Sequence, residues 1–187
     1  MAALIVYYSR TGSTRIVATA LARGTGGMLR ELVDVSPRSN LFLSAMAALF
    51  HRRAHLVDPD YDVASYDTVV LMTPVWAGNP TPAFNAFVQN ARLAGKRVTI
   101  VALGRSGQGV AASSRLEQMV RARGGRVQGV YHIHGLTGKE GLARSATTEK
   151  LQAEGERIAE LLRRPRDEEG GAGNGHPEPD AGPIAHG

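Results

Sequence analysis

Short apolar runs alternate with longer amphipathic stretches along the first 163 residues of the chain. Four of the five runs are β-branched and almost continuously apolar, which is typical of strands in a parallel sheet that helices cover on both faces. The predicted strands are residues 3–8, 29–35, 68–73, 97–103 and 126–133. The predicted helices are residues 13–23, 41–53, 82–93, 110–123 and 146–164. This alternation predicts a doubly wound α/β sandwich.

Proline and glycine mark several of the predicted boundaries. Pro82 stands in the first turn of the third helix, where its missing N–H costs nothing. Gly24, Gly95 and Gly124 follow the first, third and fourth helices. We expect these glycines to end the helices that they follow.

The last part of the chain departs from this pattern. Residues 165–187 are rich in Gly, Pro, Asp and Glu, so they cannot bury enough surface to offset the entropy of ordering. The sequence predicts one domain over residues 1–164 and a disordered acidic tail. The net charge is +5, but residues 164–187 carry −3, which leaves +8 on residues 1–163. This basic charge favours acidic partners and anionic ligands.

Cysteine is absent, which excludes disulfides, thiolate metal sites and cysteine nucleophiles. Any redox chemistry would therefore need a cofactor. No window approaches the ~20 apolar residues of a membrane span, and no leader pattern opens the sequence. We expect a cytoplasmic protein with no membrane span.

The loop after the first strand has the composition of a phosphate cradle. It joins an apolar strand to a helix through hydroxyl residues and a glycine, and backbone N–H groups of a first helical turn favour an anion. Its residues are Ser9, Arg10, Thr11, Gly12, Ser13 and Thr14. The chain contains no Walker-type motif and no G-x-G-x-x-G, so nucleotide hydrolysis and dinucleotide binding are not expected.

Two further loops follow the third and fourth strands, and carboxyl ends of parallel strands meet at one edge of the sheet. One loop carries the only tryptophan of the chain, whose flat ring suits a planar ligand. Its residues are Thr73, Pro74, Val75, Trp76, Ala77, Gly78 and Asn79. The other has three glycines, which allow close approach of the backbone to a ligand. Its residues are Gly104, Arg105, Ser106, Gly107, Gln108 and Gly109.

Together the three loops resemble those of the flavodoxin family, across about residues 3–163, in its short form. The resemblance implies a sheet of order 2-1-3-4-5 and an FMN that cycles between oxidised, semiquinone and hydroquinone states. It places the phosphate on residues 9–14, one face of the isoalloxazine on residues 73–79 and the pyrimidine edge on residues 104–109. It also implies that a peptide at Gly78 turns over on reduction, so Gly78→Ala should shift the potentials more than the affinity.

The chain departs from that family in two respects. Its body is basic, whereas electron-shuttling flavodoxins are typically acidic, and residues 104–109 contain no second aromatic to cover the other flavin face. Arg105 is expected either near the pyrimidine edge, where it would raise the hydroquinone potential, or in solvent. A cation ~4 Å from the flavin would interact by about 4 kcal/mol at an effective dielectric constant of ~20.

Several functions stay open. We favour an FMN electron carrier, with a redox partner protein or a small-molecule acceptor, because no nicotinamide-binding motif is visible. The alternatives are an NAD(P)H-dependent FMN oxidoreductase of quinone reductase type and a flavin-free binding module that uses the basic surface. Nucleic acid is not the expected partner, and a phosphoacceptor would need acids where Ser9 and Thr73 stand.

Two features are expected to be structural. His132 and His134 lack a third ligand at motif spacing, so no metal site is predicted. The apolar residues 41–50 fit a buried helix, although a dimer face or a flavin cover remains open. Monomer and homodimer are both compatible with the sequence.

Overall fold

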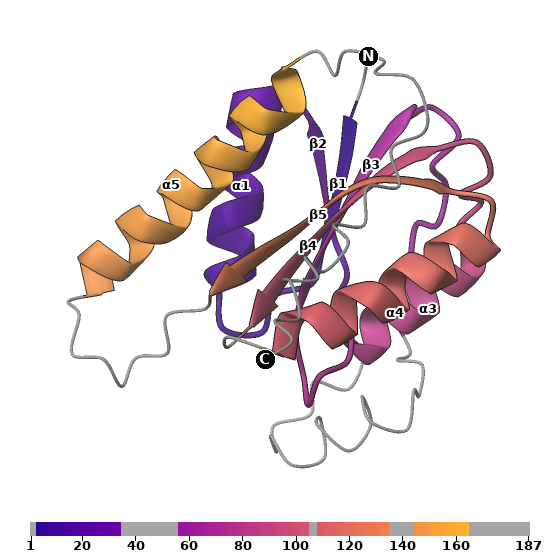
Figure 1. The fold of residues 1–187 in the computed structure, drawn as a ribbon, viewed down its shortest axis with the longest axis horizontal. Coiled ribbons are helices and arrows are strands. Elements are labelled where there is room, and N and C mark those ends of the chain that lie inside the picture. The colour runs from indigo at the N-terminus through magenta and orange to yellow at the C-terminus, as the bar shows by residue number, and fades with distance from the viewer. Residues whose placement is uncertain (1–2, 35–55, 105–107, 135–143, 165–187) are drawn as a thin grey trace, which may run out of the picture.

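The computed structural model describes residues 3–34, 56–104, 108–134 and 144–164. Five strands form one parallel sheet of order β2-β1-β3-β4-β5 (Figure 1), which confirms the predicted fold class and strand order. The strands are β1 (Ala3–Tyr7), β2 (Met28–Glu31), β3 (Thr68–Pro74), β4 (Arg97–Gly104) and β5 (Arg126–His134).

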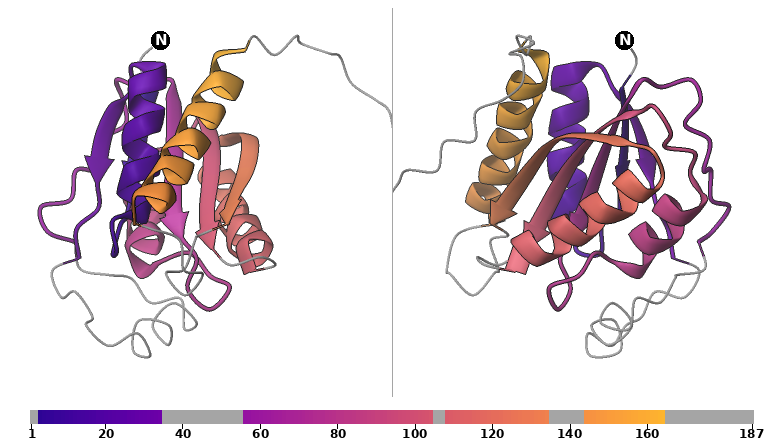
Figure 2. Two further views of the ribbon diagram at one scale, coloured as in Figure 1. Left: turned by 90° about the vertical axis from the view of Figure 1, so that its left-hand side faces the viewer. Right: turned by 45° about the vertical axis from the view of Figure 1, so that its right-hand side comes forward.

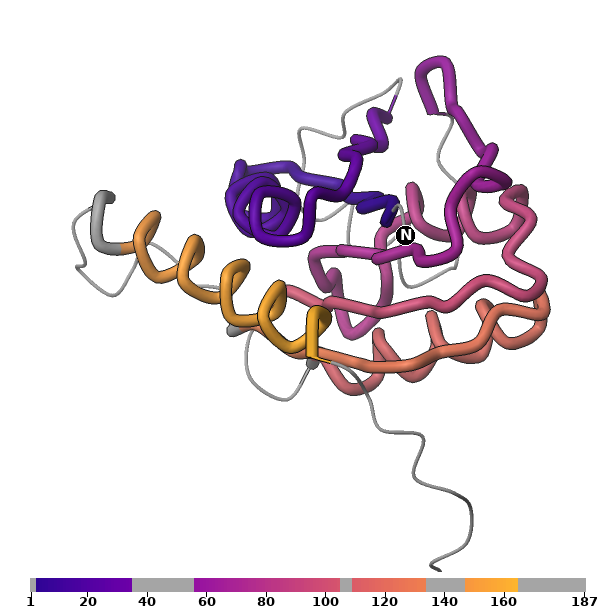
Figure 3. Tube along the Cα trace, turned by 90° about the horizontal axis from the view of Figure 1, so that it is seen from above, coloured from indigo at the N-terminus to yellow at the C-terminus, as the bar shows by residue number. Residues whose placement is uncertain are grey.

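Helices cover both faces of the sheet. The described helices are α1 (Ser13–Thr25), α3 (Pro82–Asn90), α4 (Gln108–Ala122) and α5 (Arg144–Arg163). Helices α1 and α5 lie together on one face, and α3 and α4 lie on the other (Figures 1 and 2). The view from above in Figure 3 also separates the two pairs. The predicted helix over residues 41–53 and the predicted tail lie outside the described residues.

Alternate strand residues feed two hydrophobic cores, as the two-residue period of a strand requires. Leu4 and Leu71 belong to the core that also contains Phe84 and Phe87 of α3. Their strand neighbours Ile5, Val70 and Met72 belong to the core under α1 and α5. Because both faces are buried, the strand sequences are apolar without alternation.

The edge strand β2 is shorter than the predicted strand of residues 29–35. The last backbone hydrogen bond between this part of the chain and its neighbour β1 is the one that the Leu32 N–H donates to the Tyr7 carbonyl, at 2.7 Å. Since β1 ends at Tyr7, the following residues turn away, and Asp34 forms an isolated antiparallel bridge with Leu56. The strand ends there because its partner ends.

The predicted stop at Gly24 is wrong, because Gly24 lies inside α1 and the helix ends at Thr25 with Gly26 in a left-handed conformation. A Cβ at Gly24 would lie 2.5 Å from the Cβ of Ala159 on α5. Gly155 of α5 makes the reciprocal contact, since its Cβ would lie 2.6 Å from the Val17 carbonyl oxygen. Glycines thus let the two helices approach backbone to backbone.

The other two predicted stops differ from each other. Gly124 stands two residues after Ala122, the last residue of α4, with a φ of 75°, and marks the end of this helix as predicted. Helix α3 ends earlier than predicted, at Asn90, because Ala91 is extended. Gly95, with a φ of 75°, therefore lies in the turn that enters β4 rather than at the end of a helix.

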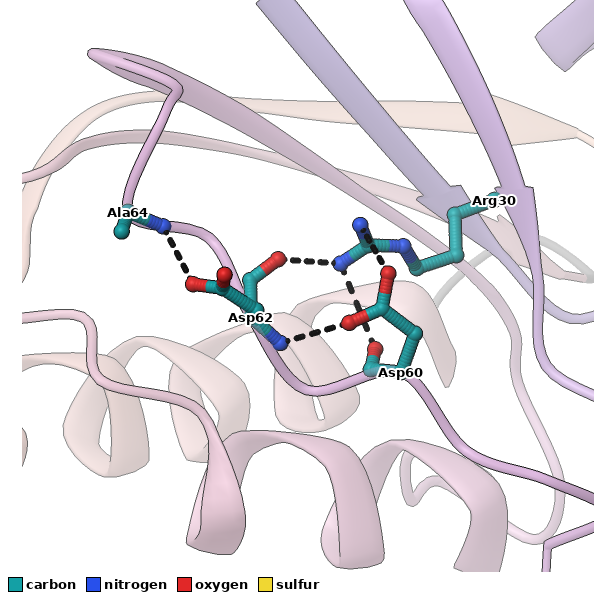
Figure 4. Close-up of polar contacts among 4 residues, drawn as sticks. All are labelled: Arg30, Asp60, Asp62 and Ala64. Carbon is teal, nitrogen blue, oxygen red and sulfur yellow. Dashed lines mark hydrogen bonds and ion pairs between the residues drawn. The ribbon is translucent and has the colours of Figure 1, made fainter.

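An arginine fastens the loop before β3 to the edge of the sheet (Figure 4). Arg30 of β2 donates hydrogen bonds to the carbonyls of Asp60 and Asp62, at 3.2 and 2.6 Å, and pairs with the Asp60 carboxylate at 2.5 Å. The aspartates also hold the loop from within, because their carboxylates accept from the N–H groups of Asp62 and Ala64. The hydrogen bonds from Arg30 and those to the two carboxylates thus hold the backbone of residues 60–64 in place.

Among the described helices, none is both long and apolar enough to cross a bilayer.

Candidate functional site

The three predicted loops begin at the carboxyl ends of β1, β3 and β4, which are neighbours in the sheet. Backbone bonds continue past the strand ends: the Tyr8 N–H donates to Met72 at 3.2 Å, and the Val75 N–H donates to Leu103 at 2.8 Å. A Cβ at Gly104 would lie 2.9 Å from the Cβ of Val75. The start of the glycine loop therefore packs against the tryptophan loop, as one edge of a parallel sheet predicts.

The first loop ends in a helix N-terminus whose N-cap residue has no side chain. The N-cap of α1 is Gly12, whose φ of 94° is left-handed, and no acid stands in the first turn of this fully described helix. The Ser9 hydroxyl accepts a bond from the Arg15 N–H at 3.3 Å. Ser9 thus occupies one N–H of the first turn, but the N-cap residue Gly12 has no side chain and the turn has no acid, so α1 favours an anion at its remaining first-turn N–H groups.

The hydroxyls of this loop differ in exposure. Thr14 is buried, Ser9 and Ser13 are half-buried, and Thr11 is exposed together with Arg10. A set of half-exposed hydroxyls and N–H groups suits phosphate oxygens. Thr14 is 3% exposed, and its predicted contact with the phosphate stays a prediction.

A charged network closes the side of this loop next to β2. Glu31 accepts hydrogen bonds from the Arg15 guanidinium at 2.6 Å and from the Tyr7 hydroxyl at 3.2 Å. Burial, followed by the nearby Glu31 carboxylate, raises the pKa of Tyr7 above its usual value, and the hydrogen bond to Glu31 raises the pKa of Arg15. Glu31 thus compensates the charge of Arg15 from β2. The first turn of α1 itself contains no carboxylate that would compensate the positive end of the helix.

Trp76 connects the first and second loops. Its half-buried ring makes an edge-on contact with Tyr8, with ring centroids 5.6 Å apart and planes at 84°. The guanidinium carbon of Arg10 lies 5.9 Å from the centre of the Trp76 ring. This distance is within the range of a cation–π contact. The structure therefore brings the hydroxyl loop and the tryptophan together, as the sequence predicts.

Trp76 and Asn79 close a two-residue turn. Each N–H donates to the carbonyl of the other residue, at 3.0 and 2.9 Å. The residues between them, Ala77 and Gly78, have φ values of 48° and 73°. Two positive φ angles inside such a pair of bonds are typical of a type I′ turn, which strongly prefers glycine, asparagine or aspartate. Gly78 satisfies this preference and Ala77 does not.

This geometry changes the meaning of Gly78→Ala as a test of peptide movement. A Cβ at Gly78 would meet no atom within 4 Å, so space is available. The φ of 73° nevertheless strains an alanine there. The substitution would perturb the turn itself as well as any turning over of its peptides.

The side chain of Asn79 links this turn to α4. The residue is 6% exposed, its amide N–H donates to the Ala77 carbonyl at 2.9 Å, and its amide oxygen accepts from the Arg115 guanidinium at 2.5 Å. The sequence analysis missed Arg115 because it stands 36 residues away on an ordinary helix. Only the folded chain brings it to the loop.

Thr73 is buried and its hydroxyl donates to the Pro74 carbonyl at 2.9 Å, while the Thr81 N–H donates to it at 3.3 Å. Both bonds brace the start of the tryptophan loop. Thr73 is thus engaged inside the protein, whereas Pro74 and Val75 are half-buried at the edge.

The third loop is described only at its ends. Arg105, Ser106 and Gly107 lie outside the described residues, as does the side chain of Gln108, so the expectations for them stay predictions. A Cβ at Gly109 would lie 2.9 Å from the imidazole of His132. At Gly104 and Gly109 the missing side chains thus make room for protein atoms.

His132 of β5 makes a hydrogen bond with a side chain of α4. Its Nε2 lies 2.8 Å from the hydroxyl of Ser113, which also donates to the Val110 carbonyl at 3.0 Å. The bond ties β5 to α4. The side chain of His134 lies outside the described residues.

A five-stranded parallel sheet of order 2-1-3-4-5, with helices on both faces and three loops gathered at the carboxyl edge, defines a flavodoxin-like α/β protein. No family model matches the sequence, and no curated protein matches it. The chain has the flavodoxin-like fold, and its structural neighbours support this assignment.

Three solved structures illustrate the similarity. A protein described as a flavoprotein from Bacteroides uniformis is 20% identical, with a TM-score of 0.64 over 80% of this chain and 97% of that one. A flavoprotein in complex with FMN from Lactobacillus acidophilus is 22% identical, with a TM-score of 0.58 over 70% and 91%. Oxidised flavodoxin 2 from Bacillus cereus is 19% identical, with a TM-score of 0.54 over 87% and 97%.

Proposed function

We propose that this chain binds FMN at the carboxyl edge of its sheet and transfers electrons through it. The observation that carries the proposal is the N-terminus of α1, which has a glycine N-cap and no acid in its first turn, together with the half-buried ring of Trp76, which the Arg10 side chain of the same loop contacts. A phosphate and a planar ring system are the two recognisable ends of FMN. The Lactobacillus acidophilus neighbour was crystallised with this cofactor.

The donor set fits the cofactor. Ser9, Thr11 and Ser13, with the N–H groups of the first turn of α1, would hold the phosphate. Trp76 would lie against the ring system, and the backbone near Gly104 would line another part of it. FMN supplies both one-electron and two-electron chemistry when bound, and the protein orients it and sets its potentials.

Arg10 has a place in this arrangement. Its guanidinium lies over Trp76, where a planar ligand would also stack. A flavin that stacked on this face of the ring would displace Arg10. Trp76 is the only tryptophan, so its fluorescence reports on flavin binding beside the ring.

The test is a titration of the purified chain with FMN and with riboflavin, which lacks the phosphate. We expect FMN to bind at least 100-fold more tightly, about 2.7 kcal/mol. Ser13→Asp should weaken FMN by about the same factor and leave riboflavin unchanged, because the carboxylate repels phosphate while it stabilises the helix N-terminus.

Gln118→Glu on the exposed face of α4 is the matched control, since it changes the net charge by the same amount. Equal affinities for FMN and riboflavin, or equal losses in both variants, would contradict the phosphate site. Absence of micromolar FMN binding would end the proposal and favour a flavin-free module that uses the basic surface.

A second experiment separates the two flavin functions. The FMN-loaded protein is reduced anaerobically with dithionite and then, in a fresh sample, with NADPH. We expect reduction by dithionite alone, as for a carrier that needs a protein or small-molecule partner. Rapid bleaching by NADPH would instead identify an NAD(P)H-dependent oxidoreductase.

A further inference from the structure

Arg115 is unusual among the arginines that the structure describes with a side-chain bond. Five others, at positions 15, 30, 121, 157 and 164, pair with carboxylates. Arg115 is half-buried, and its guanidinium donates instead to the neutral amide of Asn79. The guanidinium of Arg115 therefore orients the side chain of Asn79.

The chemistry of the two side chains fixes that orientation. A guanidinium only donates, so it must face the amide oxygen of Asn79 and not the amide nitrogen. With the oxygen toward Arg115, the nitrogen points at the Ala77 carbonyl and donates to it at 2.9 Å. If the amide were reversed, its oxygen would face that carbonyl oxygen and its NH2 would face the guanidinium.

We propose that Arg115 is a positioning residue that holds the Ala77 carbonyl in place through the amide of Asn79, and so fixes the peptide between Ala77 and Gly78. This inference rests on the proposed FMN site for its functional meaning. It rests on the hydrogen bonds alone for its structural meaning.

The backbone of the turn adds to this resistance. Turning the Ala77–Gly78 peptide over would rotate ψ of Ala77 by about half a turn while its φ stayed near 48°. Positive φ with such a ψ belongs to a region populated essentially by glycine, at a cost of about 1–3 kcal/mol. The relay from Arg115 and the side chain of Ala77 thus oppose the same movement.

In an FMN-loaded protein, this loop would respond to reduction less than a glycine-rich loop without such a relay. Arg115 lies in α4, beyond the first turn of that helix, and does not face the ligand in our proposal. It would nevertheless tune the reduction potentials of the bound FMN. The functional consequence is a narrower separation between the two one-electron midpoint potentials.

The primary experiment uses ligand-free protein, so it does not depend on FMN binding. Amide hydrogen exchange is measured at Trp76, whose N–H donates to the Asn79 carbonyl at 3.0 Å. Arg115→Met removes the donors and keeps an apolar stem. We expect exchange about tenfold faster at Trp76, equivalent to about 1.4 kcal/mol of local opening. Arg121→Met is the control, because Arg121 pairs with Glu117 on the same helix.

Asn79→Asp separates the two halves of the relay. The carboxylate keeps an acceptor for Arg115 but loses the donor to Ala77, so exchange at Trp76 should again accelerate even though the contact with Arg115 gains charge. A role for Arg115 in stability alone predicts no acceleration in this variant. This second variant also decides the question if Arg115→Met does not fold.

The FMN-loaded proteins supply the functional readout. Relative to Arg121→Met, Arg115→Met should widen the separation of the two one-electron midpoint potentials by about 59 mV. This corresponds to about a tenfold change in the equilibrium constant that links the three redox states. Unchanged exchange at Trp76 in both Arg115→Met and Asn79→Asp would overturn the inference. Failure of the wild-type protein to bind FMN would instead overturn the proposed function, and the exchange data would still decide the role of Arg115.

Discussion

Two loops of this molecule are each fastened by one arginine, and they are fastened differently. Arg30 binds the loop at Asp60 and Asp62 through backbone carbonyls and a carboxylate (Figure 4). Arg115 reaches the turn of residues 76–79 only through the side chain of Asn79. Direct bonds to the backbone fix a loop for stability. A relay through an amide fixes the direction of one particular carbonyl.

The backbone conformations extend the comparison. Within the described residues, two that are not glycine have positive φ, and each belongs to one of these regions: Asp58 at 39° and Ala77 at 48°. Aspartate tolerates this conformation because its side chain bonds locally, whereas alanine has no such compensation. Strain is therefore expected at the turn beside Trp76 and much less near Asp60.

The largest expected effect is on the free energy of unfolding, and it distinguishes Arg30 from Arg115. Arg30→Met should lower the free energy of unfolding by about 1–2 kcal/mol, because two bonds to carbonyls and one ion pair are lost. We expect no change in hydrogen exchange at Trp76 beyond this global loss. Urea denaturation and native-state exchange measure both quantities. Faster local opening at Trp76 would show that the two loops are not independent.

A smaller effect tests the difference in backbone strain. Ala77→Gly should raise the free energy of unfolding by about 0.5 kcal/mol, since relief at positive φ exceeds the added entropy of the unfolded chain. Asp58→Gly should change it by less than about 0.3 kcal/mol, because aspartate already tolerates the conformation. Thermal unfolding of the pair measures the contrast. Equal gains at both positions would contradict it.

The smallest expected effect is a coupling near zero. Arg30→Met combined with Arg115→Met should destabilise by the sum of the single changes, within about 0.5 kcal/mol, because the two arginines share no hydrogen-bond partner. A double-mutant cycle by urea denaturation measures this coupling. A larger value would mean that both arginines act on one cooperative segment.

The sequence predicts the alternation of strands and helices well because the buried strands have no polar face to confuse the pattern. It fails at the edge strand β2, where pairing with β1 rather than apolarity sets the end. It also fails at Gly24. In sequence, a glycine that leaves room for a neighbouring helix cannot be told from a glycine that ends the helix it stands in. Both errors come from contacts between segments distant in the chain.

The candidate site shows the same limit. The gathering of three loops follows from parallel strands alone, and the contact between Arg10 and Trp76 agrees with it. The engagement of Asn79 by Arg115 could not be predicted, because one arginine of α4 is indistinguishable in sequence from its neighbours. The buried, internally bonded Thr73 could not be separated from exposed hydroxyls for the same reason.

The contact between Gly24 and Ala159 concerns the order in which the molecule is completed. Helix α1, which presents its N-terminus at the candidate site, is made first, and its packing partner α5 is the last described element of the chain. The glycine contacts between them cannot form until residues 155–159 have left the ribosome. Helix α1 therefore keeps the face that packs on α5 uncovered until α5 has been synthesised.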